Sequence, residues 1–195
     1  MTTGNGNRDI AMDAFQEYWN ELLLACREDV SASPNVYTVP QRRSFNPMKI
    51  HRHLQHVYIG ELKSDDFLEV RLAGTGIDEA VGFSVKGGNY LDFCPASERQ
   101  FYVAICKAVV AWPCGMKMVR SVTHKSGRVH QYSTLSFPLA DRNGVPKYIV
   151  GMASVVKDIA NVGFPPPEEV IWQINDFKFL DIGAGMPPLP DFLCL

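Results

Sequence analysis

The sequence predicts an α+β domain: one five-stranded antiparallel sheet with helices over one face, preceded by an N-terminal amphipathic helix.

 Two observations predict it. Apolar residues alternate along five segments separated by turn signals, two of them before a helical region and three after it. Ahead of these segments, apolar residues recur at the i, i+3, i+4, i+7 spacing of a helix with one apolar face. Strands and helices in this order are typical of a sheet covered by helices.

The composition is that of a globular protein without a marked charge. Of its 195 residues, 46% are hydrophobic and 21% are charged, and the net charge is −2, so neither nucleic acid nor an anionic membrane is an expected partner. No apolar run approaches the ~18 residues of a membrane span, and the polar amino end lacks the apolar core of a signal peptide. Five cysteines without a CxxC pair favour free thiols. We therefore expect a cytoplasmic protein.

The amino-terminal part predicts a tail and two helices. Residues 1–8 are expected to be a disordered tail, and residues 9–56 to contain the N-terminal helices. Asp9 can cap the first helix. Asn46 can cap the second, with Pro47 at its first helical position. The apolar stripe of the first helix consists of Phe15, Tyr18, Trp19, Leu22, Leu23 and Cys26.

Residues 57–160 predict the core of the domain. Its first two strands, Val57–Lys63 and Phe67–Ala73, form a hairpin. Gly74 ends the second strand because a residue without Cβ can form a sharp corner. Thr75 then caps a short helix, with Asp78 as its capping-box partner.

A long helix and three strands complete the predicted core. Ser97 and Gln100 form a capping box that opens this helix, which runs to about Trp112. The strands are expected at Met116–Lys125, Val129–Ala140 and Lys147–Val156, with Ser-Gly and Asn-Gly turn signals between them. The last part, 161–195, reads as a proline-rich linker and an apolar C-terminal extension without an assigned secondary structure.

Several motifs support a family resemblance. The segment "LADRNGVPKYIVGMASVVKDIA" resembles the end of a PAS core, although Ala160 stands where many PAS domains have threonine. The early Trp19, "VPQRRSFNP" at 39–47, "FLEVRLAGT" at 67–75 and "LSFPLADRNG" at 135–144 are similar to a bacterial PAS-like family with an RxxGT motif. The resemblance covers roughly residues 15–160. It implies a sensory or regulatory module in signal transduction, and it names no ligand and no cofactor.

The PAS resemblance implies an internal cavity suited to a small organic ligand. Its walls are expected to come from one face of the strands, from the long helix and from the loop before that helix. The alternative is that the same side chains pack together in a dry core. The candidate ligand-binding residues are Tyr90, Phe93, Phe101, Ile105, Met118, Ser133, Leu135, Met152 and Ser154.

The stripe of the first helix is the candidate partner-binding surface, represented by Phe15, Trp19 and Leu22. It can pack on the outer face of its own sheet or against the same helix in a second copy, and the resemblance favours a homodimer. We expect no output domain in the chain, so a signal would pass to an unidentified protein partner.

Two other functions are weighed against this reading. An isomerase or hydrolase in a cone-shaped pocket needs a buried acid or base, for which Asp92 and His124 are the candidates. A haem-binding sensor needs an iron ligand, but His51, His53 and His56 are better explained as solvent-facing. Cys94 lies where flavin photosensors carry a reactive cysteine, yet "NYLDFCPAS" lacks their Asn-Cys-Arg-Phe context. The sequence therefore predicts a sensor that is not an enzyme.

Overall fold

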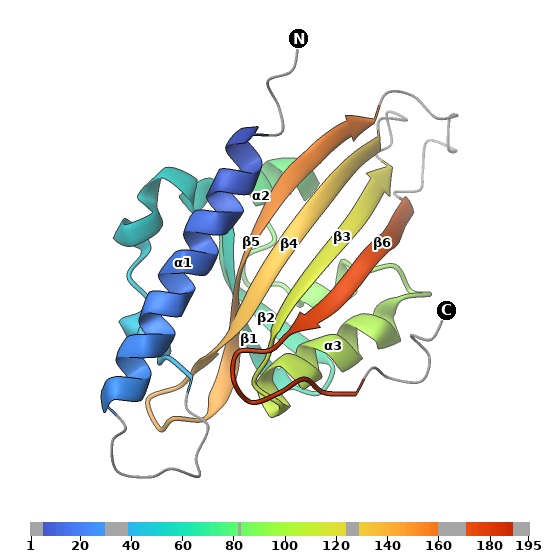
Figure 1. Ribbon diagram of the computed structural model, residues 1–195. Coiled ribbons are helices and arrows are strands. Elements are labelled where there is room, and N and C mark those ends of the chain that lie inside the picture. The colour runs from blue at the N-terminus through green and yellow to red at the C-terminus, as the bar shows by residue number, and fades with distance from the viewer. Residues whose placement is uncertain (1–5, 30–38, 82, 124–128, 160–170, 189–195) are drawn as a thin grey trace.

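The computed structural model describes residues 6–29, 39–81, 83–123, 129–159 and 171–188. In this part of the chain, six antiparallel strands form one sheet in the order β2-β1-β5-β4-β3-β6, with helices on both faces (Figure 1). The predicted α+β class is confirmed. No helix in these ranges is long and apolar enough to cross a bilayer.

The elements follow the predicted order. The strands are β1 (Val57–Ser64), β2 (Phe67–Ala73), β3 (Gly115–Thr123), β4 (Val129–Ala140), β5 (Pro146–Ile159) and β6 (Ile171–Leu180). The α-helices are α1 (Gly6–Asp29), α2 (Thr75–Val81) and α3 (Arg99–Ala111), and the 3-10 helices are η1 (Arg42–Ser44), η2 (Pro47–His56) and η3 (Tyr90–Asp92). The predicted Ser-Gly turn at 126–127 lies outside the described residues.

The sixth strand corrects the expected strand count. β6 lies within the C-terminal extension and pairs with β3 along its whole length, from Gly115 opposite Leu180 to Thr123 opposite Ile171. Its β-branched and aromatic residues suit a strand. Phe179 is buried beneath α3, so the extension is part of the core. No strand was predicted here, because the residues before β6 contain no hairpin turn signal.

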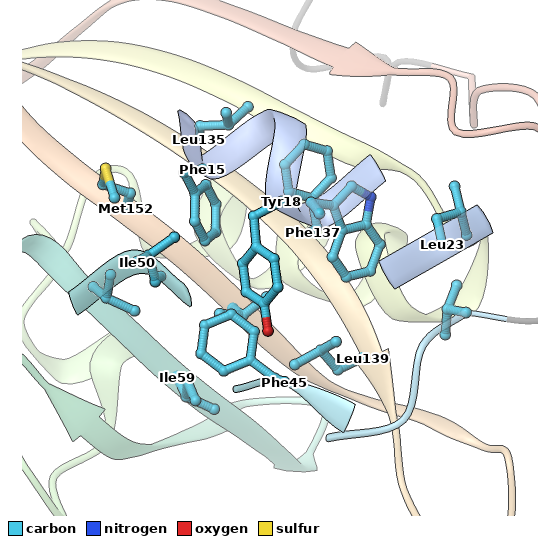
Figure 2. Close-up of a cluster of buried hydrophobic side chains, with 14 of the residues drawn as sticks. Phe15, Tyr18, Leu23, Phe45, Ile50, Ile59, Leu135, Phe137, Leu139 and Met152 are labelled. Carbon is cyan, nitrogen blue, oxygen red and sulfur yellow. The ribbon is translucent and has the colours of Figure 1, made fainter. Parts of the chain in front are cut away.

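Helix α1 packs on the face of the sheet opposite to α3 (Figure 1). It begins at Gly6, three residues before the predicted cap. Phe15 and Trp19, each 1% exposed, contact the ring of Phe137 on β4. Figure 2 shows Phe15 and Phe137 in this cluster with Leu135 and Met152. The apolar stripe of α1 is therefore covered by the sheet of its own chain.

The corner after β2 explains the glycine of the Gly-Thr pair. Helix α2 begins at Thr75 itself, so the predicted cap at Thr75 is wrong by one residue. A Cβ at Gly74 would overlap the backbone of Leu54 and Gln55 in η2, so only glycine lets these two segments meet. The Asn46 side chain accepts a hydrogen bond from the Met48 N–H at 3.0 Å and caps η2 as predicted. Asp78 accepts a hydrogen bond from the Val85 N–H at 3.1 Å, which anchors the loop after α2.

The predicted start of the long helix is wrong by one residue. Helix α3 begins at Arg99, and its N-cap, Glu98, makes no side-chain capping bond. Ser97 therefore lies before the cap position, where its hydroxyl cannot form the predicted capping box with Gln100. The buried face of α3 packs over the sheet through Phe101, Tyr102, Ile105, Cys106, Val109 and Val110.

Candidate ligand cavity

A cavity of about 70 Å³ lies on the α3 face of the sheet. Strand β1 supplies Ile59 and Gly60 to its lining, and Tyr90 of η3 closes another side. A cavity of ~10–15 Å³ holds one water, and an apolar cavity of ~150 Å³ can hold benzene. This one can therefore hold a small ligand. Most of the lining is apolar and includes Leu68, Val70, Met116, Met118 and Ile149.

Four polar side chains enter this apolar lining: Tyr58, Tyr90, Arg120 and Thr134. The Tyr58 hydroxyl shares a hydrogen bond of 2.5 Å with Ser136 Oγ. Arg120 Nη1 donates to the Tyr90 hydroxyl at 3.2 Å. Thr134 is 4% exposed, and its Oγ1 has no hydrogen-bond partner among the described residues. Three strands and η3 thus bring a few polar groups together in an apolar cavity, as small-molecule sites do.

The local environment fixes the charges of these groups. Burial raises the pKa of Tyr58 to about 12 and outweighs the Ser136 hydrogen bond and the Arg120 charge, which lower it. Burial also raises the pKa of Tyr90 well above its ordinary value. Both phenols are therefore neutral at physiological pH. The Arg120 guanidinium keeps its positive charge, so the cavity carries one cation among neutral groups.

The structure places five of the nine predicted pocket residues on the α3 face or in its loops. Tyr90 and Met118 line the cavity. Phe101 and Ile105 belong to the core cluster beside it without lining it. Phe93 follows η3 and packs edge-on against Phe83, with ring centroids 5.5 Å apart. That these residues bind a ligand stays a prediction.

The other four predicted residues point to the wrong face. Leu135 and Met152 pack in the α1 cluster. Ser133 and Ser154, opposite each other in the β4–β5 register, share that face by alternation. The cavity is lined instead by the intervening residues Thr134 and Ala153.

The error on β4 and β5 has a physical cause. These strands are buried on both faces, so their apolar residues do not show which side faces the cavity. The large ring of Phe137 offered a signal, because the aromatic stripe of α1 needs a large apolar counterpart on the sheet. On β4, the residues at two-residue spacing from Phe137 therefore face α1.

Arg120 is the cavity residue that sequence reasoning missed. It follows Met116 and Met118 at two-residue spacing on β3, and all three line the cavity. A charged residue continuing an apolar strand face is a signal of a polar function inside the core. Arg71 on β2, in contrast, forms an ion pair, with its Nη1 2.8 Å from Glu69 Oε1.

The candidates for other functions that lie within the described residues do not line the cavity. Asp92 is exposed, and its Oδ1 accepts hydrogen bonds from Asn89 and Arg99. His124 lies outside the described residues. Among the residues that line the cavity there is no carboxylate and no histidine. The described residues contain no group of three potential metal ligands from His, Cys, Asp and Glu.

Cys94 is buried next to η3. Its Sγ lies 3.5 Å from the Tyr90 carbonyl oxygen, to which it donates. Burial raises the pKa of this thiol to about 12, so it is protonated and weakly nucleophilic at neutral pH.

Comparison with protein families identifies the fold. A family described as PAS domain matches residues 8–154. The chain belongs to the PAS domain family, which supports a sensory module. No curated protein matches the chain.

Two solved structures illustrate how the chain compares with known proteins, both at low sequence identity. A variant of RsLOV shares 14% identity over 56% of this chain and 65% of its own, with a TM-score of 0.44. The photo-excited blue-light photoreceptor Vivid shares 19% identity over 69% of this chain and 92% of its own, with a TM-score of 0.39. This chain therefore spans slightly less than two thirds of the RsLOV chain.

Proposed function

We propose that the chain is a non-enzymatic sensory module of the cytoplasm, which binds a small molecule in the cavity and signals its occupancy to a protein partner. The observation that supports this proposal is the mostly apolar cavity, which is also lined by the polar side chains of Tyr58, Tyr90, Arg120 and Thr134. Apolar walls with a few convergent polar groups are the general form of a small-molecule site.

The sheet offers a route from the cavity to the opposite face. On β5, Ala153 lines the cavity, and its neighbour Met152 packs in the α1 cluster. A ligand that favours one position of β5 would therefore also favour one packing of α1 on the sheet. Such a ligand shifts the balance only through its different affinities for the two arrangements.

The protein partner needs a surface outside the α1 stripe. Phe15 and Trp19 are used within the chain, and Leu22 packs against the same cluster. On α1, Ile10 and Leu24 remain 60% exposed. A homodimer through α1 stays a prediction, and its contacts would have to use this outer side of the helix.

Cavity filling tests the proposal. Ala153→Leu adds volume at the cavity lining, and Ala25→Leu makes the same change on the exposed side of α1. We expect native mass spectrometry of the freshly purified protein, or a thermal-shift screen, to find a ligand that binds the original protein and the Ala25→Leu variant. Ala153→Leu should abolish this binding. A ligand that binds a folded Ala153→Leu variant with unchanged affinity, or no ligand at all, would contradict the proposal.

A visible absorption spectrum of the same preparation addresses the haem-sensor alternative. A haem band would favour that alternative, whereas a colourless protein with a bound molecule would favour the ligand proposed above.

A further inference from the structure

Arg120 brings a permanent positive charge to a mostly apolar cavity. Its side chain lines the cavity on the same strand face as Met116 and Met118. The Tyr90 hydroxyl accepts a hydrogen bond from Nη1 at 3.2 Å. Placing a cation in apolar surroundings is costly unless acceptors or anions compensate for the lost hydration. Tyr90 and Tyr102 both interact with the guanidinium, and the Glu98 carboxyl lies within electrostatic reach of it. At the cavity, the same guanidinium can also pair with a negatively charged ligand group.

Two irregularities of the sheet meet at Arg120. Between β3 and β6, Val119 pairs with Asp176 and Arg120 with Ile174, so Asn175 is an extra residue opposite this step. On the other side, Arg120 pairs with Tyr132, where the register between β4 and β5 also shifts. Bulges redirect side chains and are enriched next to functional sites. The strand pairing at Arg120 is therefore irregular, whereas the pairing on either side of it is regular.

A second polar group lies on the neighbouring strand. Thr134 on β4 pairs with Met118 and lines the cavity, and its buried Oγ1 has no hydrogen-bond partner among the described residues. Its hydroxyl can donate to an anionic oxygen. A buried polar atom without a partner calls for a ligand or a water.

From these groups we infer that the ligand is a small organic acid, bound as its carboxylate by Arg120 with help from Thr134. This inference rests on the proposed function. The apolar part of the acid contacts Met116, Met118 and Ile149. Among the described residues, none that lines the cavity carries a carboxylate that would repel an anion. The cavity of about 70 Å³ restricts the acid to a short chain, because it is about half the size of a cavity that holds benzene (~150 Å³).

The test compares charged and neutral ligands of equal shape on the full chain. Acetate, propionate, butyrate and valerate are titrated by calorimetry beside their primary amides, at constant ionic strength. We expect at least one acid to bind about tenfold more tightly than its amide, since a charge-assisted hydrogen bond exceeds a neutral one.

Variants then assign the contact. Arg120→Gln should weaken binding of that acid about tenfold and leave its amide nearly unaffected. Thr134→Val should weaken the acid by a smaller factor, and Arg52→Gln, at an exposed arginine of η2, should change nothing. If Arg120→Gln does not fold, the acid–amide comparison on the original protein and the Thr134→Val variant still decide.

The outcomes separate the two proposals. Equal binding of an acid and its amide, both lost in Ala153→Leu, would overturn the inference and leave the proposed cavity function standing. A second result would also overturn the inference and leave the proposed cavity function standing. In that result none of the acids binds, but an uncharged library ligand does, and Ala153→Leu abolishes its binding. If no acid, amide or library compound binds, both proposals are overturned.

Discussion

The indole of Trp19 on α1 stacks on the ring of Phe137 on β4, with ring centroids 4.8 Å apart and planes inclined by 3°. Both side chains are 1% exposed. Trp19→Ala should lower the free energy of unfolding by about 3–5 kcal/mol, because it leaves a cavity beneath the helix. Urea unfolding followed by circular dichroism measures this change.

The matched control for this prediction lies on the other side of the same helix. Leu24 is 60% exposed, so Leu24→Ala should change the free energy of unfolding by less than about 0.5 kcal/mol. Similar losses in the two variants would show that α1 does not depend on its sheet contact.

Gly74 should tolerate no side chain. Gly74→Ala places a Cβ against the backbone of Leu54 and Gln55, and we expect a loss of about 2 kcal/mol or more in unfolding free energy. Gly87 has a positive φ of 82° but open space around its Cβ position, so Gly87→Ala should cost only about 1 kcal/mol. Chemical denaturation that finds Gly74→Ala the milder change would contradict this reading of the corner.

Stability should fall at alkaline pH. Burial raises the pKa of Tyr58 from 10.0 to about 12 and that of Cys94 from 9.0 to about 12. The unfolded chain thus releases these protons first, and the folded state loses stability as the pH rises from about 9 towards 12. Urea unfolding at a series of pH values measures the slope, which Tyr58→Phe should reduce. A free energy of unfolding that stays constant over this range would refute the assignment.

The free energy of unfolding should also fall at acid pH, because of Glu61. Burial by itself would raise the pKa of this carboxyl, but hydrogen bonds from Lys147 and Lys63 outweigh burial and lower the pKa below 4.5. The ion pairs therefore stabilise the fold above the unfolded pKa and lose that effect as the pH falls through the folded pKa. We expect the decline to begin near pH 4.5.

Replacing the carboxyl checks this prediction. The two lysine side chains are 40% and 38% exposed, so solvent screening limits the expected loss in Glu61→Gln to about 1 kcal/mol at neutral pH. Glu17→Gln, on the exposed side of α1, is the control. A Glu61→Gln variant whose stability declines with acid as steeply as the original protein would count against the role of Glu61.

β6 should contribute to the stability of the whole domain. Phe179 is 6% exposed and packs against Phe177, with ring centroids 4.9 Å apart. Phe179→Ala should therefore cost about 3 kcal/mol in unfolding free energy, whereas Phe83→Ala, at a 52% exposed side chain, should cost far less. Equal costs in thermal or urea unfolding would mean that β6 is only loosely attached.

Local patterns predicted the fold because the elements of this chain carry strong local signals. β2 was predicted with its observed bounds, and the Asn46–Pro47 start of η2 is confirmed. β6 escaped prediction as a strand, since its pairing with β3 depends on contacts between distant residues and on no local turn. The capping box at Ser97 was wrong because the helix begins after it.

The candidate site was harder to predict than the fold. Tyr90 and Met118 were predicted from their places near the long helix and on β3. Which residues of β4 and β5 face the cavity was predicted incorrectly. Alternation fixes which residues share a face, and tertiary packing decides which face is which. Arg120 could not be placed in the cavity until the face of β3 was known.

The pairing of β6 beside β3 has a mechanical consequence. Arg120 and Ile174 are partners across these two strands, next to the bulge at Asn175. Farther along, the Trp112 indole at the end of α3 donates to the Ala184 carbonyl oxygen at 2.9 Å. Movement of the cavity wall at Arg120 would therefore pass through the hydrogen bonds between the two strands into β6, and from there to the segment that holds Ala184.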